Sequence, residues 1–541
     1  MIALLAALAM LPSLYSGITS GNDMAQHYQF AVTAYDSLVS GQIYPSIAGT
    51  MNHGLGDVSF RFYPPLSYYV LASVYLLVHD WYIASLFSFF LVFFVGGTGV
   101  YLWAKEEFSS AQSLLAAGIF IFAPFHLNEI YNNFLLAEFS ASAIIPFCFL
   151  FLTRVVRRGG LLDVLGLAIS YALLVLTHLP STVICSIALL IHGLVLLKSS
   201  PVKRSLLNLS IAVTLGLAMS SFYWLRMLTE IDWVKHSGEL YSSGIWGYQT
   251  NFLFAPGRLI NFQDDSLNLW LADLMLLAML LLSVPTIVFL VRKRTQMSSY
   301  VSAVLAVFVL TVFMTSPLSE QVWANVSFLQ KVQFPWRWLA VLSGVGSVFA
   351  SIGLFKVSDA LKNSRSIVLP IAIGSMIIVY VFTSAVVVKG AVYNSRDGFN
   401  LSIENLNGRE TFEGWWPTWA QPAAFSREQK ISLSGRENSI VEWTPSEKEF
   451  VVQPGVGETA AVAALYYPHW TASINGRPVP VSPTETGLIT IEIPPELSQV
   501  DLKFEEPLKI KAAFGISGLA WLTTVILVII GLASGRRKEI N

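Results

Sequence analysis

Charge is what this sequence has least of. Only 12% of its 541 residues are charged, whereas a soluble protein keeps roughly a quarter of its residues charged. Hydrophobic residues make up 54% of the chain. This composition excludes an ordinary soluble protein and predicts an integral membrane protein.

Cysteine and the common soluble-enzyme motifs are also scarce. The two cysteines, Cys148 and Cys185, lie in apolar stretches, which argues against a disulfide framework or a thiolate metal site. The chain has no GxGxxG, Walker, HExxH, CxxC or GxSxG pattern, so soluble nucleotide chemistry is not indicated. A net charge of −1 without a basic patch predicts no nucleic-acid partner.

Long apolar runs are abundant. Because they are continuously apolar instead of alternating, they predict membrane-spanning helices, each of about 17 to 25 residues, and not a barrel. Thirteen runs are candidates: 2–19, 66–78, 82–104, 110–127, 139–153, 161–176, 181–197, 206–225, 269–291, 300–316, 338–355, 367–388 and 512–533.

The run 66–78 is short for a span and suits an interfacial helix. If it does not cross, all the basic clusters fall on one side of the membrane, as the positive-inside tendency requires. These clusters are Arg154/Arg157/Arg158, Lys198/Lys203/Arg204, Arg292/Lys293/Arg294, Lys356/Lys362/Arg365 and Arg536/Arg537/Lys538. We therefore predict a juxtamembrane helix at 65–79, about twelve spanning helices and cytoplasmic termini. The first run lacks the basic flank and cleavage site of a secretory signal, so we expect it to remain as a helix.

This topology divides the chain into three parts. Residues 1–388 form a transmembrane bundle with outer loops at 20–81 and 227–268. Residues 389–511 alternate in hydropathy and break at Pro, Gly and Asn, which predicts an extracytoplasmic β-sandwich-like domain. Residues 512–541 form the last helix and a basic cytoplasmic tail.

An acid follows the first run directly, in "GNDMAQHYQF". Asp23 has His27 as its i+4 neighbour. One interpretation is that Asn22 or Asp23 caps a short helix and that His27 is solvated. The other is that Asp23 is a general base or binds a cation, with its loop folded back to shield it from water. Spacing leaves both open.

Other polar residues are expected at the same depth. Glu138, in "NNFLLAEF", is either a helix N-terminal charge or a second functional acid. His178, in "LTHLPST", is a turn histidine or a ligand contact. Arg337, between two tryptophans, is an interfacial anchor or a phosphate ligand. Further candidate cations are Arg226, Lys235 and Arg258.

The segments "GNDMAQHYQF", "FRFYPPLSYYVLA", "VQFPWRWLA" and "LYYPHWTASINGRPV" resemble two related groups of proteins. The architecture resembles the family-C (GT-C) membrane glycosyltransferases, which take a sugar from a polyprenyl-phosphate carrier. The motifs are most similar to bacterial YfhO-type, pyruvoyl-tetrahydropterin-synthase-related membrane proteins. "PPLSYY" is similar to an element of lipid A aminoarabinose and protein mannosyl transferases.

This resemblance implies an inverting glycosyltransferase with Asp23 as catalytic base and Glu138 as a second acid. His27, Tyr63, His178, Lys235, Arg258 and Arg337 would contact the substrate. Glu138 stands where relatives have an Asp pattern, which leaves metal dependence open. A divalent cation, Mg or Mn, would use Asp23 and Glu138.

The implied partners are a polyprenyl-phosphate-sugar donor and a glycan, lipid or protein acceptor. The acceptor could lie on the aromatic run Trp415, Trp416 and Trp419, although plain core packing also explains that run. The implied location is the inner membrane of a prokaryote, with the site outside. The alternative is a non-enzymatic protein that transports or docks a lipid-linked glycan. Ion transport is disfavoured because charges inside the spans are lacking.

Overall fold

The computed structural model describes residues 1–198, 200–237, 243–257, 269–293, 297–363, 368–426 and 429–540. Within these ranges, eight helices are long and apolar enough to cross a membrane, or nine if one bent pair counts as a span. Three apolar helices are shorter. The predicted helical membrane protein with a C-terminal β-rich region is confirmed, whereas the number of twelve spans stays a prediction.

Two predicted spans are interrupted. The run 2–19 forms α1 (Ile2–Ala9) and α2 (Leu11–Ser16), which separate at Met10, just before Pro12. The run 110–127 forms α6 (Ser110–Ile121) and α7 (Pro124–Tyr131). A proline suits the first turn of a new helix but not the interior of a continuous one, which accounts for both breaks.

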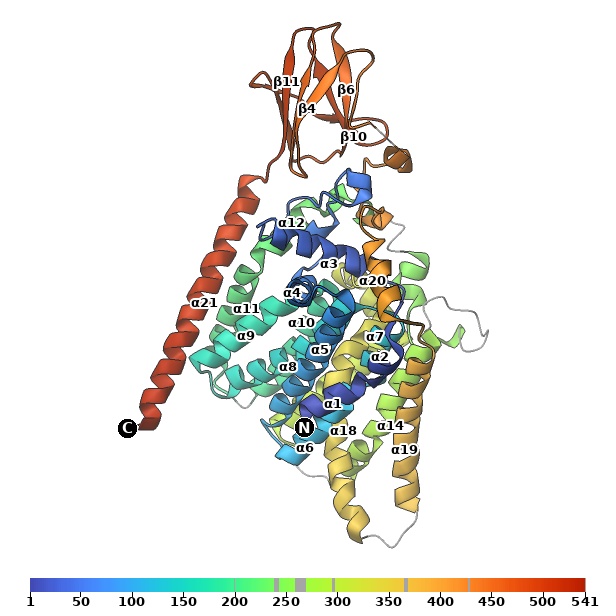
Figure 1. Cartoon of the computed structure of the whole chain (residues 1–541). Coiled ribbons are helices and arrows are strands. Elements are labelled where there is room, and N and C mark those ends of the chain that lie inside the picture. Colours follow the sequence, from blue (N-terminus) through green and yellow to red (C-terminus); the bar gives the residue numbers. More distant parts are fainter. Residues whose placement is uncertain are drawn as a thin grey trace.

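The first outer loop folds over the bundle. It contains α3 (Met24–Val39), a short 3-10 turn at Ser59–Arg61, and α4 (Leu66–Val78). The predicted helix 65–79 is therefore present, and at 13 residues it is about 20 Å long, too short to cross a bilayer core of about 30 Å. Figure 1 shows α3 and α12 between the β domain and the deeper helices.

The bundle is built from longer helices. They are α5 (Trp81–Ala104), α8 (Leu136–Arg157), α9 (Leu161–Val175), α10 (Leu179–Leu197), α11 (Val202–Met219), α14 (Leu269–Lys293), α15 (Ser299–Thr315), α18 (Leu339–Asn363) and α19 (Val368–Lys389), and the short α12 (Ser221–Glu230) follows α11. The span that includes α18 is the most enclosed. Gly353 lets α18 approach α14, because a Cβ there would lie 2.1 Å from the backbone nitrogen of Thr286.

The C-terminal domain consists of two antiparallel sheets. One has the order β3-β6-β10-β9 and the other β4-β5-β11-β7-β8. The strands are β3 (Ile431–Ser432), β4 (Asn438–Trp443), β5 (Glu447–Val452), β6 (Glu458–Leu465), β7 (Trp470–Ile474), β8 (Arg477–Val479), β9 (Ser482–Pro483), β10 (Leu488–Ile493) and β11 (Ser498–Phe504). Burial alternates along β5, β7 and β11, so these strands place one face on a shared core.

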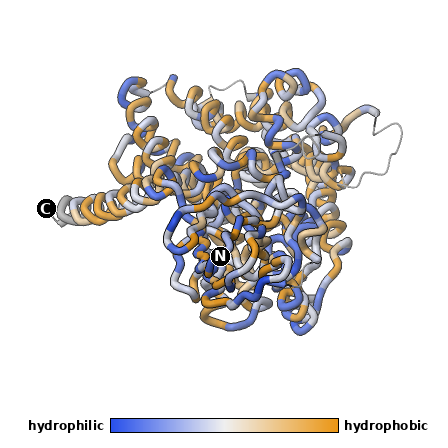
Figure 2. Tube along the Cα trace, turned by 90° about the horizontal axis from the view of Figure 1, so that it is seen from above, coloured by the Kyte–Doolittle hydropathy of each residue, from blue (hydrophilic) through white to orange (hydrophobic). Residues whose placement is uncertain are grey.

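The N-terminal and C-terminal segments make different contacts with the rest of the protein. Strand β1 (Ile18–Thr19) pairs with β2 (Tyr393–Asn394), which joins the first loop to the segment before the β domain. After β11 the chain enters α21 (Leu508–Ile540), a largely exposed apolar helix at the margin of the bundle. Figure 1 shows α21 along the margin of the bundle, with both termini far from the β domain, and Figure 2 shows the C-terminal end projecting from the bundle.

Candidate functional site

Asp23 is held close to the loop between α7 and α8. It follows β1 and occupies the N-cap position of α3, but its side chain makes no capping hydrogen bond. Its backbone N–H donates to the carbonyl of Asn133 at 3.4 Å. Gly21 permits this approach, because a Cβ at that position would lie 2.6 Å from Cβ of Phe134. The carboxylate is therefore placed by backbone contacts and left available for other partners.

His27 is buried, so the interpretation of a solvated histidine is wrong. The side chain is 2% exposed, and its Nδ1 lies 2.7 Å from the hydroxyl of Tyr68. Burial lowers the pKa of His27 to about 3, which keeps the imidazole neutral. Its Nε2 is buried without a hydrogen-bond partner.

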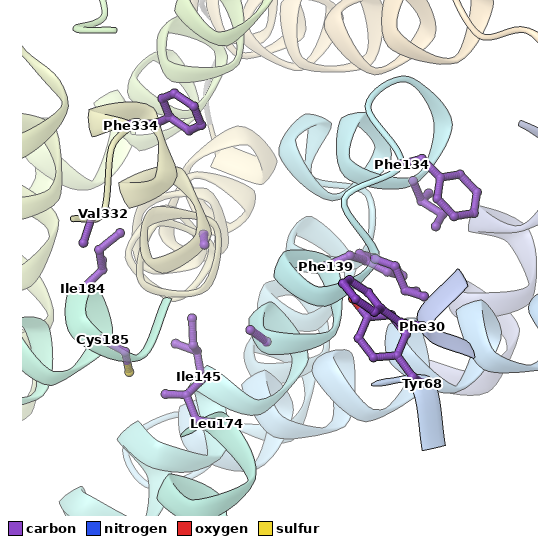
Figure 3. Packing of buried hydrophobic residues seen from close by; sticks show 14 of the residues in the cluster. Phe30, Tyr68, Phe134, Phe139, Ile145, Leu174, Ile184, Cys185, Val332 and Phe334 are labelled. Atoms are coloured by element: carbon purple, nitrogen blue, oxygen red, sulfur yellow. The ribbon is translucent and has the colours of Figure 1, made fainter. Parts of the chain in front are cut away.

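Aromatic rings form the wall around His27. Tyr63 lies edge-on to His27 with ring centroids 6.0 Å apart, and Phe30 lies 5.1 Å from Tyr68. Figure 3 shows Phe30 and Tyr68 within the buried cluster that also contains Phe139. Burial raises the pKa of the Tyr63 hydroxyl, and the negative charge of Asp23 raises it further. Tyr63 thus stays protonated beside the acid.

Arg337 and Glu138 form a buried ion pair. Nε of Arg337 donates to Oε2 of Glu138 at 3.1 Å, and the two side chains are 11% and 2% exposed. Arg337 lies in the 3-10 turn Pro335–Trp338, where its Nη1 also donates to the carbonyl of Val332 at 2.6 Å. Its guanidinium lies 4.7 Å from the ring centre of Phe334. Oε1 of Glu138 has no hydrogen-bond partner.

Asp23 belongs to the same cluster as this pair. Burial raises the pKa of Asp23, and the positive charge of Arg337 opposes that rise. The structure therefore brings together the first-loop acid, the second acid and the tryptophan-flanked arginine, which are far apart in the sequence. We call Asp23, Glu138 and Arg337, together with His27 and Tyr63, the chamber.

Glu129 is a third acid of the chamber that the sequence analysis missed. It lies on α7, is fully buried, and neither of its carboxylate oxygens has a hydrogen-bond partner. The charges that act on it are those of Glu138, Arg337 and Asp23. The signal in the sequence was an acid five residues after Pro124, which starts a helix. The predicted apolar run 110–127 ended before this acid.

His178 also faces the chamber. It precedes α10, is 5% exposed, and its Nδ1 lies 2.8 Å from Oγ of Ser181. Burial lowers its pKa well below the ordinary value, and the charge of Arg337 lowers it further. The turn role is therefore observed, and the charge of Arg337 acts on this histidine.

The other candidate cations have different surroundings. Lys235 pairs with Glu413 at 2.8 Å and lies 5.0 Å from the ring centre of Trp416. Its neighbour His236 is closer to the site: burial lowers its pKa to about 4, and Arg337 contributes to this shift. Arg226 joins a separate cluster, described below. Arg258 lies outside the described residues.

Trp415, in the segment between α19 and β3, covers the chamber. Its ring is stacked on His236 at 4.4 Å and lies edge-on to Tyr63 at 6.0 Å. Trp416 packs against Phe425 at 4.5 Å, and Trp419 packs against Tyr466 at 5.0 Å. Trp415 and Trp416 are buried, so for these two the packing interpretation fits better than an open acceptor platform.

The divalent cation predicted at Asp23 and Glu138 stays a prediction. Within the described ranges, Glu230, His469 and Glu506 are the only group of three acids, histidines or cysteines whose ligand atoms lie within 4.8 Å of one another. They are outside the chamber, and Arg61 and Arg226 donate to their carboxylates. Asp23 and Glu138 do not form a comparable three-ligand group, so no step below uses a metal.

Comparison with known families gives one decisive match. A family model described as "6-pyruvoyl-tetrahydropterin synthase related domain; membrane protein" matches residues 60–388, which is more than half of the chain. The chain belongs to this family. The match contains Tyr63, Glu129, Glu138, His178 and Arg337, whereas Asp23 and the β domain lie outside it. No curated protein sequence matches the chain.

Several solved structures share a distant likeness. The oligosaccharyltransferase of Archaeoglobus fulgidus is 13% identical, with a TM-score of 0.43, and the alignment covers 78% of this chain and 61% of that one. The arabinofuranosyltransferase AftD from Mycobacteria is 14% identical, with a TM-score of 0.42 and coverages of 72% and 26%. ArnT from Cupriavidus metallidurans is 11% identical, with a TM-score of 0.39 and coverages of 75% and 75%. The chain thus spans less than two thirds of the first two proteins, and at these scores the likeness says nothing about its activity.

Proposed function

We propose that this protein is a membrane glycosyltransferase that moves a sugar from a polyprenyl-phosphate-linked donor to an acceptor on the extracytoplasmic side. The observations that carry the proposal are the ion pair of Arg337 with Glu138 and the partly buried Asp23 carboxylate, on which the positive charge of Arg337 acts. A base and a phosphate-binding cation are the two groups that this reaction needs.

Asp23 acts as the general base. It takes the proton of an acceptor hydroxyl while that oxygen attacks the anomeric carbon of the donor sugar. The bond between the anomeric carbon and the phosphate oxygen breaks on the opposite face, and its electron pair leaves with the phosphate, so the configuration inverts. Because burial raises the pKa of Asp23, its carboxylate is a stronger base than an exposed aspartate.

Arg337 stabilises the departing phosphate. A guanidinium can hold two phosphate oxygens at once, and it acts most strongly in a site that excludes water. In this structure its Nε is bonded to Glu138, so a donor phosphate that binds through Nε and an Nη nitrogen has to displace that carboxylate. Glu138 thereby holds Arg337 in place until the donor arrives.

The neutral side chains around these charges shape the sugar site. His27, Tyr63 and His178 offer hydrogen-bonding atoms without adding charge, since burial keeps both imidazoles neutral. The donor's prenyl chain would remain in the bilayer while the sugar enters the chamber. The acceptor, a glycan, lipid or protein, would enter from outside, and the location would be the inner membrane of a prokaryote.

The substitution Asp23→Asn tests this proposal, because it preserves side-chain size and removes basicity. Purified protein in lipid vesicles would be given a panel of polyprenyl-phosphate sugars and membrane extract as acceptor. We expect transfer to fall by about 10² to 10⁴-fold with donor binding retained. Asp80→Asn is the matched control, since Asp80 pairs with Arg396 on the outer surface.

The same experiment separates the enzyme from a non-enzymatic protein that docks or transports lipid-linked glycans. If Asp23→Asn transfers sugar at the wild-type rate, the general-base role is wrong. If wild type binds the donor but transfers no sugar in the panel, the docking function is the better description.

A further inference from the structure

Arg61, two residues before Tyr63, is the centre of a second buried cluster. Its guanidinium is 1% exposed and uses all five of its N–H donors. Nε and Nη2 donate to the two oxygens of Glu230 at 2.8 and 2.9 Å. Nη1 and Nη2 donate to the two oxygens of Glu506 at 2.6 and 3.1 Å, and Nη1 also donates to the carbonyl of Ser46 at 2.9 Å.

The partners of Arg61 are themselves fixed. Glu230 accepts hydrogen bonds from the hydroxyl of Tyr467 at 2.8 Å and from Nε2 of His469 at 2.9 Å. Glu506 also accepts from Nη2 of Arg226 at 2.9 Å. We call Arg61, Arg226, Glu230, Glu506, Tyr467 and His469 the clamp.

The clamp joins four parts of the chain. Arg61 belongs to the first outer loop, and Arg226 and Glu230 belong to α12. Tyr467 and His469 connect β6 to β7, while Glu506 lies between β11 and α21. The β domain is therefore fixed to the bundle by buried charges, and these charges converge on one residue of the loop that covers the chamber.

The residues after Arg61 carry this constraint to the chamber. Phe62 is stacked with Trp415 at 6.2 Å, and Tyr63 contacts both Trp415 and His27 with centroids 6.0 Å away. Pro64 and Pro65 then lead into α4, which carries Tyr68. With Arg61 immobile, Tyr63 has little freedom to move away from His27 and Trp415.

We propose that Arg61 is a positioning residue: the clamp uses the β domain to hold Tyr63 against His27 and Trp415 and so closes the chamber to water. The effect of Arg61 on catalysis rests on the proposed function. Its effect on the position of Tyr63 does not. The β domain is thus required for the geometry of the site although it contributes no charged group to it.

Hydrogen–deuterium exchange of the full-length protein in lipid nanodiscs tests the link directly. Glu506→Gln removes one carboxylate of the clamp and no residue of the chamber. We expect amide exchange to rise by about tenfold in the segments 58–66 and 411–416 while the sheets of the β domain stay protected. Glu447→Gln is the control, because Glu447 forms an exposed pair with Lys503 at 3.6 Å, and it should change neither segment.

A milder variant covers the case in which Glu506→Gln does not fold. Tyr467→Phe removes one hydrogen bond to Glu230 and leaves every charge in place. It should raise exchange in the same two segments by a smaller factor. Unchanged exchange at 58–66 in a folded clamp variant would overturn the proposal, as would a rise confined to the β domain.

Kinetics supply a readout that a general loss of structure does not give. In the vesicle assay, Glu506→Gln should lower kcat and increase donor hydrolysis relative to transfer, with KM for the donor little changed, and Glu506→Asp should restore part of kcat. A rise in KM for the donor with unchanged kcat would contradict the positioning role of Arg61. If wild type shows no transfer, the proposed function fails, and the exchange experiment still decides whether the clamp holds Tyr63.

Discussion

The chamber and the clamp are both groups of acids and arginines with little exposure, but they differ in how many of their polar atoms have hydrogen-bond partners within the protein. In the clamp, every N–H of Arg61 and every carboxylate oxygen of Glu230 and Glu506 has a partner, and Nε of Arg226 is the one buried group there without one among the described residues. In the chamber, both oxygens of Glu129 and one oxygen of Glu138 have none.

This difference separates a scaffold from a site. Burying a charge costs several kcal/mol unless hydrogen bonds and an opposite charge compensate for it. The clamp meets this requirement within the protein, so it serves stability and geometry. The chamber leaves acceptors unpaired beside a single arginine, which is the arrangement expected where a ligand supplies the missing partners.

The largest effect is expected from breaking the clamp. Glu230→Gln leaves Arg61 and Arg226 with one carboxylate between them, and removing one partner of a buried ion pair costs about 3 to 5 kcal/mol. Chemical unfolding in micelles measures this loss. The exposed-pair variant Glu447→Gln should cost about 0 to 1 kcal/mol. Equal losses in the two variants would show that the clamp is not a scaffold.

Glu138→Gln should act on binding. Because Glu138 competes with a ligand for Arg337, its neutralisation should tighten binding of a short-chain phosphodiester by about tenfold, whereas Arg337→Gln should weaken binding. Fluorescence titration can compare both variants with wild type. A loss of affinity in Glu138→Gln would mean that Glu138 orients the arginine toward the ligand.

The pH dependence of transfer tests the state of Asp23. The base works only when ionised, so the rate should fall as pH drops through its pKa, which burial raises above the ordinary value of 3.8. Removing the nearby positive charge with Arg337→Gln should move this midpoint to higher pH. A midpoint at or below the ordinary value in wild type would contradict the burial of Asp23.

Acid should affect the clamp at lower pH. Although burial raises the pKa of Glu506, its hydrogen bonds and ion pair with Arg61 dominate and lower it to about 2. The stability from this pair is therefore complete above the ordinary pKa of 4.5 and is lost as pH falls toward 2. Unfolding curves recorded across this range should show the loss in wild type and a smaller loss in Glu506→Gln.

The smallest effect is expected at Glu129. Because its carboxylate has no hydrogen bond or paired cation to lose, Glu129→Gln should change the free energy of unfolding by no more than about 1 kcal/mol. The contrast with Glu230→Gln, also at a fully buried glutamate, is the sharpest form of the comparison. A large loss at Glu129 would reveal a structural role in the chamber.

The sequence predicted elements whose signals are local. The two prolines and the short apolar run defined α4, and alternation with turn residues defined the C-terminal β domain. The positions of Asp23 and Arg337 followed from their place at predicted membrane boundaries. These features can be predicted without knowing which segments contact one another in the fold.

What was missed depends on long-range contacts. Arg61 and Glu506 are 445 positions apart, and no periodicity shows that they pair. Glu129 was missed because α7 continues the interrupted span beyond the run that hydropathy marked. The environment of His27 could not be read from spacing, since the Tyr68 that buries it comes from another helix.

The most direct test of the account is a cryo-electron microscopy structure of the protein in nanodiscs with undecaprenyl phosphate. The account predicts phosphate density within about 3 Å of the Arg337 guanidinium, on the side that faces Asp23, with the clamp unchanged. Phosphate bound elsewhere, with Arg337 still paired to Glu138, would contradict it.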